Sequence, residues 1–155
     1  MLRAMTALAP ALTCPTCAPA AGFLPGPPAE RPQVTSPEDA HAIVAPLLVG
    51  RDREHCLLVC LDVKHRLIAV STVSIGTVDH TFMAPREIFR EALLAGASAV
   101  FLAHNHPSGD PTPSADDRQV TRRLAQAGTT LGVDVLDHLV IGNPEWQSLA
   151  RLGVL

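Results

Sequence analysis

Two histidines stand one residue apart in the stretch AHNHPSGDPTPSADD, residues 103–117. In an extended segment alternate side chains point to the same side, so His104 and His106 can offer two ligands to one metal ion. Asp117 follows the proline-rich loop and is a suitable third ligand. Two histidines and one aspartate leave a fourth zinc position open for water, as in catalytic zinc sites. The stretch therefore predicts a hydrolytic zinc centre.

A second interpretation of the same residues concerns helix capping. Many histidines in loops are simply solvated, and Ser114 with Asp117 also fits an ordinary capping box at the start of a helix. The two interpretations are compatible because a serine hydroxyl donates one hydrogen bond and accepts two. Ser114 can therefore cap a helix and still help to stabilise an oxyanion.

The elements around this stretch are predicted from hydrophobic periodicity. The apolar run 97–103 indicates a strand covered on both faces, which leads directly into His104. A helix is expected from Ser114 to about Ala127, ended by Gly128, and a strand is expected over 133–142.

The preceding part of the chain predicts a helix, a hairpin and a second helix. Ser36 is the expected N-cap of a helix that extends to about Leu48. Segments 54–62 and 66–75 are rich in β-forming residues and predict an antiparallel hairpin, with a third short strand near 78–83. An amphipathic helix should begin at Pro85 and end before Gly96. The order of elements predicts a mixed α/β fold, a sheet flanked by helices.

Composition limits the class of protein. The chain has 155 residues, of which 47% are hydrophobic and 17% charged, as expected for one globular domain. We expect residues 1–33 to form a Pro/Ala-rich flexible tail and residues 34–155 to form the domain. The net charge of −3 gives no support for a DNA partner. No apolar run predicts a membrane span, so we expect a cytoplasmic protein.

The four cysteines predict no disulfide. Cys14 and Cys17 form a lone CxxC and are interpreted as solvated thiols, because a four-cysteine zinc site needs a second pair. Cys56 and Cys60 on one strand would be about 13 Å apart, too far to bridge.

The pattern HxHP followed by SxxD resembles the JAMM (MPN+) metalloprotease signature. From VTSPEDA to VLDHLVIG, about residues 34–150, the chain also resembles the RadC family. This resemblance implies a JAMM/MPN fold with a layout related to that of cytidine deaminases. It implies Zn²⁺ held by His104, His106 and Asp117, with Ser114 stabilising an oxyanion and an upstream glutamate acting as acid/base.

Three glutamates compete for the acid/base role. Glu54 precedes an apolar strand, a context similar to that of the family glutamate, whereas Glu87 and Glu91 lie in the amphipathic helix, where acidic residues face solvent. We favour Glu54. The resulting prediction is a zinc hydrolase that cleaves a peptide, isopeptide or related amide bond by Glu54-assisted attack of zinc-bound water.

The main alternative is a non-catalytic accessory module associated with DNA repair, the label that the family carries. Many RadC-like proteins have a helix-hairpin-helix region before this domain, and a Pro/Ala-rich tail stands in that place here, which weakens the case for DNA binding. Asp137 and His138 match a DH pattern of the family and are expected to be a buried, hydrogen-bonded pair, with a supporting role at the metal as the other option. The resemblance implies a protein or peptide substrate. The sequence indicates neither a particular substrate nor an oligomeric state.

An HNH nuclease, a zinc deaminase and a serine hydrolase are disfavoured. HNH nucleases disperse these residues over a ββα unit, deaminases need HxE with a downstream PCxxC, and the chain lacks GxSxG.

Overall fold

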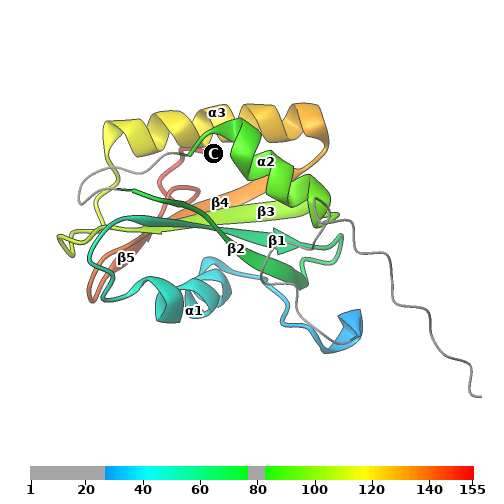
Figure 1. The fold of residues 1–155 in the computed structure, drawn as a ribbon, viewed down its shortest axis with the longest axis horizontal. Coiled ribbons are helices and arrows are strands. Elements are labelled where there is room, and N and C mark those ends of the chain that lie inside the picture. The colour runs from blue at the N-terminus through cyan, green and yellow to red at the C-terminus, as the bar shows by residue number, and fades with distance from the viewer. Residues whose placement is uncertain (1–26, 77–82) are drawn as a thin grey trace, which may run out of the picture.

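A computed structural model describes residues 27–76 and 83–155 of the chain (Figure 1). The elements in chain order are a 3-10 helix η1 (Pro28–Glu30), α1 (Pro37–Leu48), β1 (His55–Leu61), β2 (Leu67–Ile75), α2 (Pro85–Leu94), β3 (Ala99–Asn105), α3 (Ala115–Leu131), β4 (Asp134–Ile141) and β5 (Trp146–Ser148). The predicted mixed α/β fold is confirmed. Among the described residues, no helix combines the length and the apolar character needed to cross a bilayer.

The five strands form one mixed sheet in the order β2-β1-β3-β4-β5. β1 and β2 are the predicted antiparallel hairpin, and β1 also pairs antiparallel with β3. β3 and β4 run parallel, with α3 as the crossover between them, and β5 pairs antiparallel with β4. β3 therefore lies in the middle of the sheet, which explains why all its residues are buried.

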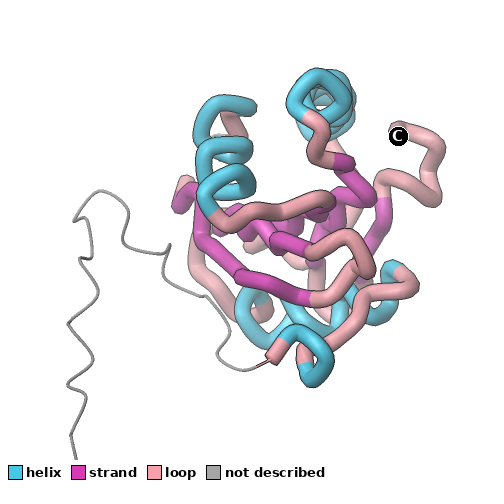
Figure 2. The backbone as a smooth tube through the Cα atoms, turned by 90° about the vertical axis from the view of Figure 1, so that its right-hand side faces the viewer, coloured by secondary structure: helices cyan, strands magenta, loops and turns pink. Residues whose placement is uncertain are grey.

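Helices cover both faces of the sheet (Figures 1 and 2). α1 lies on one face, where Val44 and Leu48 pack with Phe101 of β3. α2 and α3 lie on the other face, where Phe89 and Leu124 pack with Leu102 of β3. Because successive residues of β3 point to opposite faces, this strand contributes to both cores. His104 follows the parity of Leu102 and so points toward the α3 face.

The first helix begins as the sequence predicts. Ser36 is the N-cap of α1, its hydroxyl accepts a hydrogen bond from the backbone N–H of Asp39, and the Asp39 carboxylate accepts one in return from the N–H of Ser36. This reciprocal pair is a complete capping box, which satisfies backbone donors that the first helical turn leaves unpaired.

The predicted end of the third helix is wrong. α3 continues through Gly128 to Leu131, and it ends at Gly132, which has the left-handed φ of 70° typical of a helix C-terminus. Gly128 lies inside the helix because α3 packs closely there against Phe89 of α2 and against residues 133–135. An added Cβ would collide with the carbonyl oxygen of Val133 and lie 3.2 Å from the side chains of Phe89 and Val135. A close contact, rather than a helix end, requires this glycine.

Two further differences concern strands. β5 was not predicted, because three residues are too few to show an alternating pattern. Residues 77–82, which contain most of the predicted third strand, lie outside the described residues, as do Cys14 and Cys17.

Candidate metal centre

The three predicted ligands lie together at the end of β3. The Nε2 atoms of His104 and His106 are 3.0 Å apart, and Nε2 of His104 lies 3.3 Å from Oδ1 of Asp117. Ligands about 2.0 to 2.1 Å from a tetrahedral zinc ion lie about 3.3 to 3.4 Å from one another. Among the described residues, this cluster is the one set of histidine, cysteine or acidic side chains with ligand atoms close enough to share an ion.

Two elements bring these ligands together. His104 is fully buried in the central strand, and His106 follows one residue after the strand ends, so it is partly accessible. Asp117 lies in the first turn of α3, the helix that packs over the same face of the sheet. The site therefore has a rigid, buried side at His104 and an open side at His106.

Ser114 fixes the orientation of the Asp117 carboxylate. Ser114 donates two hydrogen bonds to Oδ2 of Asp117, one from its backbone N–H at 2.8 Å and one from its hydroxyl at 2.6 Å. The hydroxyl also accepts from the backbone N–H of Asp117, which completes the capping box. Because Oδ2 is held in this way, Oδ1 is the oxygen that faces His104. The oxyanion role of Ser114 stays a prediction.

The charges of the ligands suit a cation. Burial raises the pKa of Asp117, but the nearby His106 and His104 and the hydrogen bonds from Ser114 outweigh it, so this pKa lies well below its usual range. Burial, together with the neighbouring His138, lowers the pKa of His104 to about 3. The Asp117 carboxylate, whose Oδ2 lies 3.7 Å from Nε2 of His106, raises the pKa of His106. At neutral pH the site therefore holds an ionised carboxylate and a neutral, buried imidazole.

The Nδ1 atoms of His104 and His106, which face away from the cluster, are both hydrogen-bonded. Nδ1 of His106 lies 2.7 Å from the carbonyl oxygen of Asp110, which can only accept, so the neutral ring carries its proton there and leaves Nε2 free. Nδ1 of His104 lies 2.9 Å from Nε2 of His138, a fully buried residue of β4. The sequence predicted that His138 would be buried, but its contact with a ligand requires the parallel pairing of β3 and β4.

Glu54 lies beside the cluster. It is buried and immediately precedes β1, whose Cys56 pairs with His104 in the sheet. Its negative charge contributes to the raised pKa of both His106 and Cys56. Of the two competing glutamates, Glu87 is exposed on α2, and Glu91 is half-buried there and pairs with Arg90. Glu54 is thus the glutamate whose charge acts on the cluster.

Asn105, between the two histidines, clamps the backbone on both sides of Glu54. Its side-chain oxygen accepts from the backbone N–H of His55 at 2.9 Å, and its amide nitrogen donates to the carbonyl oxygen of Arg53 at 3.1 Å. The strand alternation turns Asn105 away from the metal ligands and toward this segment. No local sequence pattern indicates this contact, because its partner Arg53 is 52 residues away along the chain.

Comparisons with known proteins agree with this architecture. A family model described as "RadC-like JAB domain" matches residues 34–154. This chain belongs to the RadC-like JAB domain family. UPF0758 proteins from Desulfitobacterium hafniense and Caldanaerobacter subterraneus are similar to it, with 43% identity over 128 residues and 46% over 120 residues. These matches cover 83% and 77% of this chain but 56% and 52% of the relatives, so the chain spans about half of their length.

In this RadC-like JAB domain, Cys56 and Cys60 of β1 are buried free thiols, and Cys56 is the one that lies beside His104. Burial raises the pKa of Cys56 and of Cys60 to about 12, and the carboxylates of Asp117 and Glu54 add to the effect at Cys56. Without a metal ion, both thiols are therefore protonated at neutral pH. The prediction that they do not bridge each other is confirmed.

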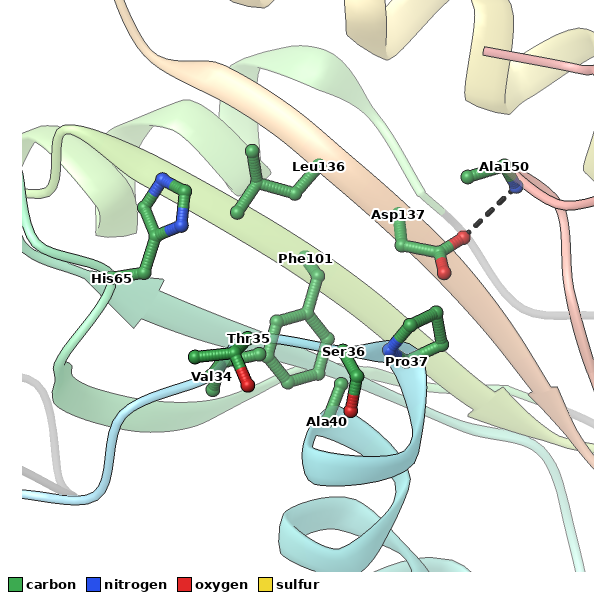
Figure 3. A pocket seen from close by; sticks show the side chains of 10 residues that line it. All are labelled: Val34, Thr35, Ser36, Pro37, Ala40, His65, Phe101, Leu136, Asp137 and Ala150. Carbon is green, nitrogen blue, oxygen red and sulfur yellow. Dashed lines mark hydrogen bonds between the residues drawn. The ribbon is translucent and has the colours of Figure 1, made fainter.

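Asp137 and His138 of the JAB domain are both buried but serve opposite faces of the sheet. Oδ1 of Asp137 accepts from the backbone N–H groups of His138 and Ala150, and Oδ2 accepts from the hydroxyl of Ser148. Figure 3 shows Asp137 at the wall of a pocket of about 220 Å³ on the α1 face, beside Phe101. Asp137 therefore ties the segment after β5 to β4, whereas the side chain of His138 contacts the candidate ligand His104.

Proposed function

We propose that this domain is a zinc-dependent hydrolase that cleaves a peptide, isopeptide or related amide bond in a protein or peptide substrate. The observation that carries the proposal is the convergence of His104, His106 and Asp117 at one partly open site. The family membership supports the same conclusion. Nitrogen and carboxylate donors of this kind suit zinc.

The three ligands would hold the ion, and Glu54 would move the protons. When bound, zinc acidifies a water molecule and polarises a carbonyl group. Glu54 accepts a proton from the attacking water as the water oxygen bonds to the amide carbon. It then donates that proton to the amine nitrogen as the C–N bond breaks. Ser114 would hydrogen-bond the developing oxyanion by turning its single hydroxyl proton away from Oδ2 of Asp117, which the Ser114 backbone N–H would continue to hold.

The first prediction concerns metal content. His104→Ala removes the most buried ligand, so the purified variant should retain almost no zinc after dialysis, whereas the wild type should retain about one ion per chain. Elemental analysis of the dialysed proteins provides the measurement. His65→Asn is the matched control, because His65 lies at the far end of the hairpin with a φ of 55°, which asparagine tolerates. Equal zinc content in His104→Ala and the wild type would count against the proposal.

The second prediction separates catalysis from metal binding. Glu54→Gln should retain zinc but lose cleavage by about 10²- to 10⁴-fold, because the amide cannot carry the proton. Cleavage of a library of peptides and isopeptide-linked peptides, read by mass spectrometry, supplies the rates. Glu87→Gln, on the exposed side of α2, should match the wild type. Absence of cleavage by the fully zinc-loaded wild type would instead favour the accessory-module interpretation.

A further inference from the structure

A chain of hydrogen bonds connects the ligand His104 to helix α3 through two residues outside the predicted site. Nδ1 of His104 lies 2.9 Å from Nε2 of His138, and Nδ1 of His138 lies 2.6 Å from the hydroxyl oxygen of Thr121. The Thr121 hydroxyl also lies 2.6 Å from the backbone carbonyl oxygen of Asp117. Thr121, His138 and His104 are all fully buried, so water does not substitute for any of these partners. We call this series the Thr121–His138–His104 chain.

The direction of each bond follows from the donors that are present. The carbonyl oxygen of Asp117 can only accept, so the single hydroxyl proton of Thr121 points toward it. Nδ1 of His138 must then be the donor to the Thr121 oxygen. A neutral His138 with its proton on Nδ1 has an unprotonated Nε2, which accepts from Nδ1–H of His104. Nε2 of His104 is left with a free lone pair.

This free lone pair faces the other ligands. Nε2 of His104 lies 3.0 Å from Nε2 of His106 and 3.3 Å from Oδ1 of Asp117. His106 has its own acceptor at Nδ1, the Asp110 carbonyl oxygen, so its neutral form also directs a lone pair to the same point. Two lone pairs and a carboxylate oxygen gathered in this way form a donor set that suits a cation.

We propose that Thr121 and His138 are positioning residues that hold His104 in the tautomer with its proton on Nδ1, so that Nε2 is ready to bind the ion. The tautomer follows from the hydrogen bonds alone, whereas its use in metal binding rests on the proposed function. The Asp117 carboxylate is a predicted ligand and its backbone carbonyl is the final acceptor of the chain. Asp117 of α3 would thus be a ligand itself and, through Thr121 and His138, would also orient the ligand His104 on β3.

The test uses the metal-free protein first. Long-range ¹H–¹⁵N correlation spectra of protein labelled with ¹⁵N-histidine report which ring nitrogen carries the proton. We expect His104 and His138 both to carry it on Nδ1 in the metal-free wild type. A proton on Nε2 of His104 would overturn the proposal, whatever the affinity for zinc.

Two variants of Thr121 then separate the hydroxyl from the shape of the side chain. Thr121→Val keeps the size but removes the acceptor for His138, so His138 should move its proton to Nε2 and force that of His104 onto its own Nε2. Zinc affinity, measured by competition with a chromophoric chelator, should fall by about 10- to 100-fold. Thr121→Ser keeps the hydroxyl and should bind zinc as the wild type does.

The outcomes distinguish the two proposals. Equal zinc affinity of folded Thr121→Val and Thr121→Ser would overturn the positioning role, and if Thr121→Val does not fold, the wild-type spectra decide the question. A wild type that has the expected tautomer but does not bind zinc would refute the proposed function and leave the assigned tautomer supported.

Discussion

Asp117 uses its two carboxylate oxygens in different ways. Oδ2 accepts both hydrogen bonds from Ser114, while Oδ1 faces His104. The capping box at α3 therefore also orients Oδ1, which belongs to the candidate metal site, because a carboxylate held at one oxygen by two donors has little freedom to rotate. The same capping chemistry occurs at Ser36 and Asp39, where it stabilises α1 alone.

The two capping boxes give a matched prediction at the scale of the residue. Ser114→Ala and Ser36→Ala should each lower the free energy of unfolding by about 0.5 to 2 kcal/mol, because each removes an N-cap hydroxyl. Only Ser114→Ala should also weaken zinc binding, by about 10-fold or more, since it releases the carboxylate of a predicted ligand. Urea unfolding and chelator competition measure the two effects. Equal zinc affinities in the two variants would show that the box at α3 is only structural.

Helix α3 is the element that brings Asp117 and Thr121 to β3 and β4. It crosses from β3 to the parallel β4 over the face on which His104 and His138 lie. Its C-terminal part approaches the chain at Val133 and Val135 so closely that position 128 has no room for a side chain. The seating of this helix therefore depends on a glycine that a sequence pattern would interpret as a helix end.

At the scale of the element, Gly128→Ala tests this seating. Alanine favours a helix by about 1 kcal/mol over glycine. The added methyl group, however, would collide with the carbonyl oxygen of Val133 and make tight contacts with the side chains of Phe89 and Val135, and overpacking of this kind costs about 1 to 3 kcal/mol or more. We expect a net loss of stability of about 1 to 2 kcal/mol in urea unfolding. Thr129→Ala, at the next and exposed position, should stay within about 0.5 kcal/mol of the wild type. A stabilised Gly128→Ala would contradict the close contact.

The folded domain buries two histidine side chains on the α3 face of its sheet. His104 and His138 have no solvent exposure, and burial lowers their pKa values to about 3 and about 4. In the unfolded chain both return to about 6.5. At pH values between the folded-state and unfolded-state pKa values of these histidines, the unfolded state binds more protons than the folded state. The free energy of unfolding therefore falls as the pH decreases from about 6.5 toward 4.

This difference predicts the acid sensitivity of the metal-free protein. Its free energy of unfolding should fall by about 1 to 3 kcal/mol for each pH unit below about 6, since each extra proton contributes about 1.4 kcal/mol per unit. His106 contributes in the opposite direction only above pH 6.5, because its pKa is raised. Urea unfolding at a series of pH values measures the slope. His138→Gln should have a smaller slope than the wild type, and a wild-type slope near zero would contradict buried, neutral histidines.

The sequence by itself determined the parts of this protein that depend on local chemistry. The capping signals at Ser36 and Ser114, the apolar run before His104 and the alternation around Asn105 were enough to predict the starts of two helices, the central strand and the three candidate ligands. The tertiary structure decided what depends on approach between distant segments. The contact of His138 with His104, the clamp of Asn105 around Glu54 and the tight space at Gly128 each join residues that are far apart in the chain or in different elements. Such contacts are set by strand order and helix seating, which leave no periodic signal in the sequence.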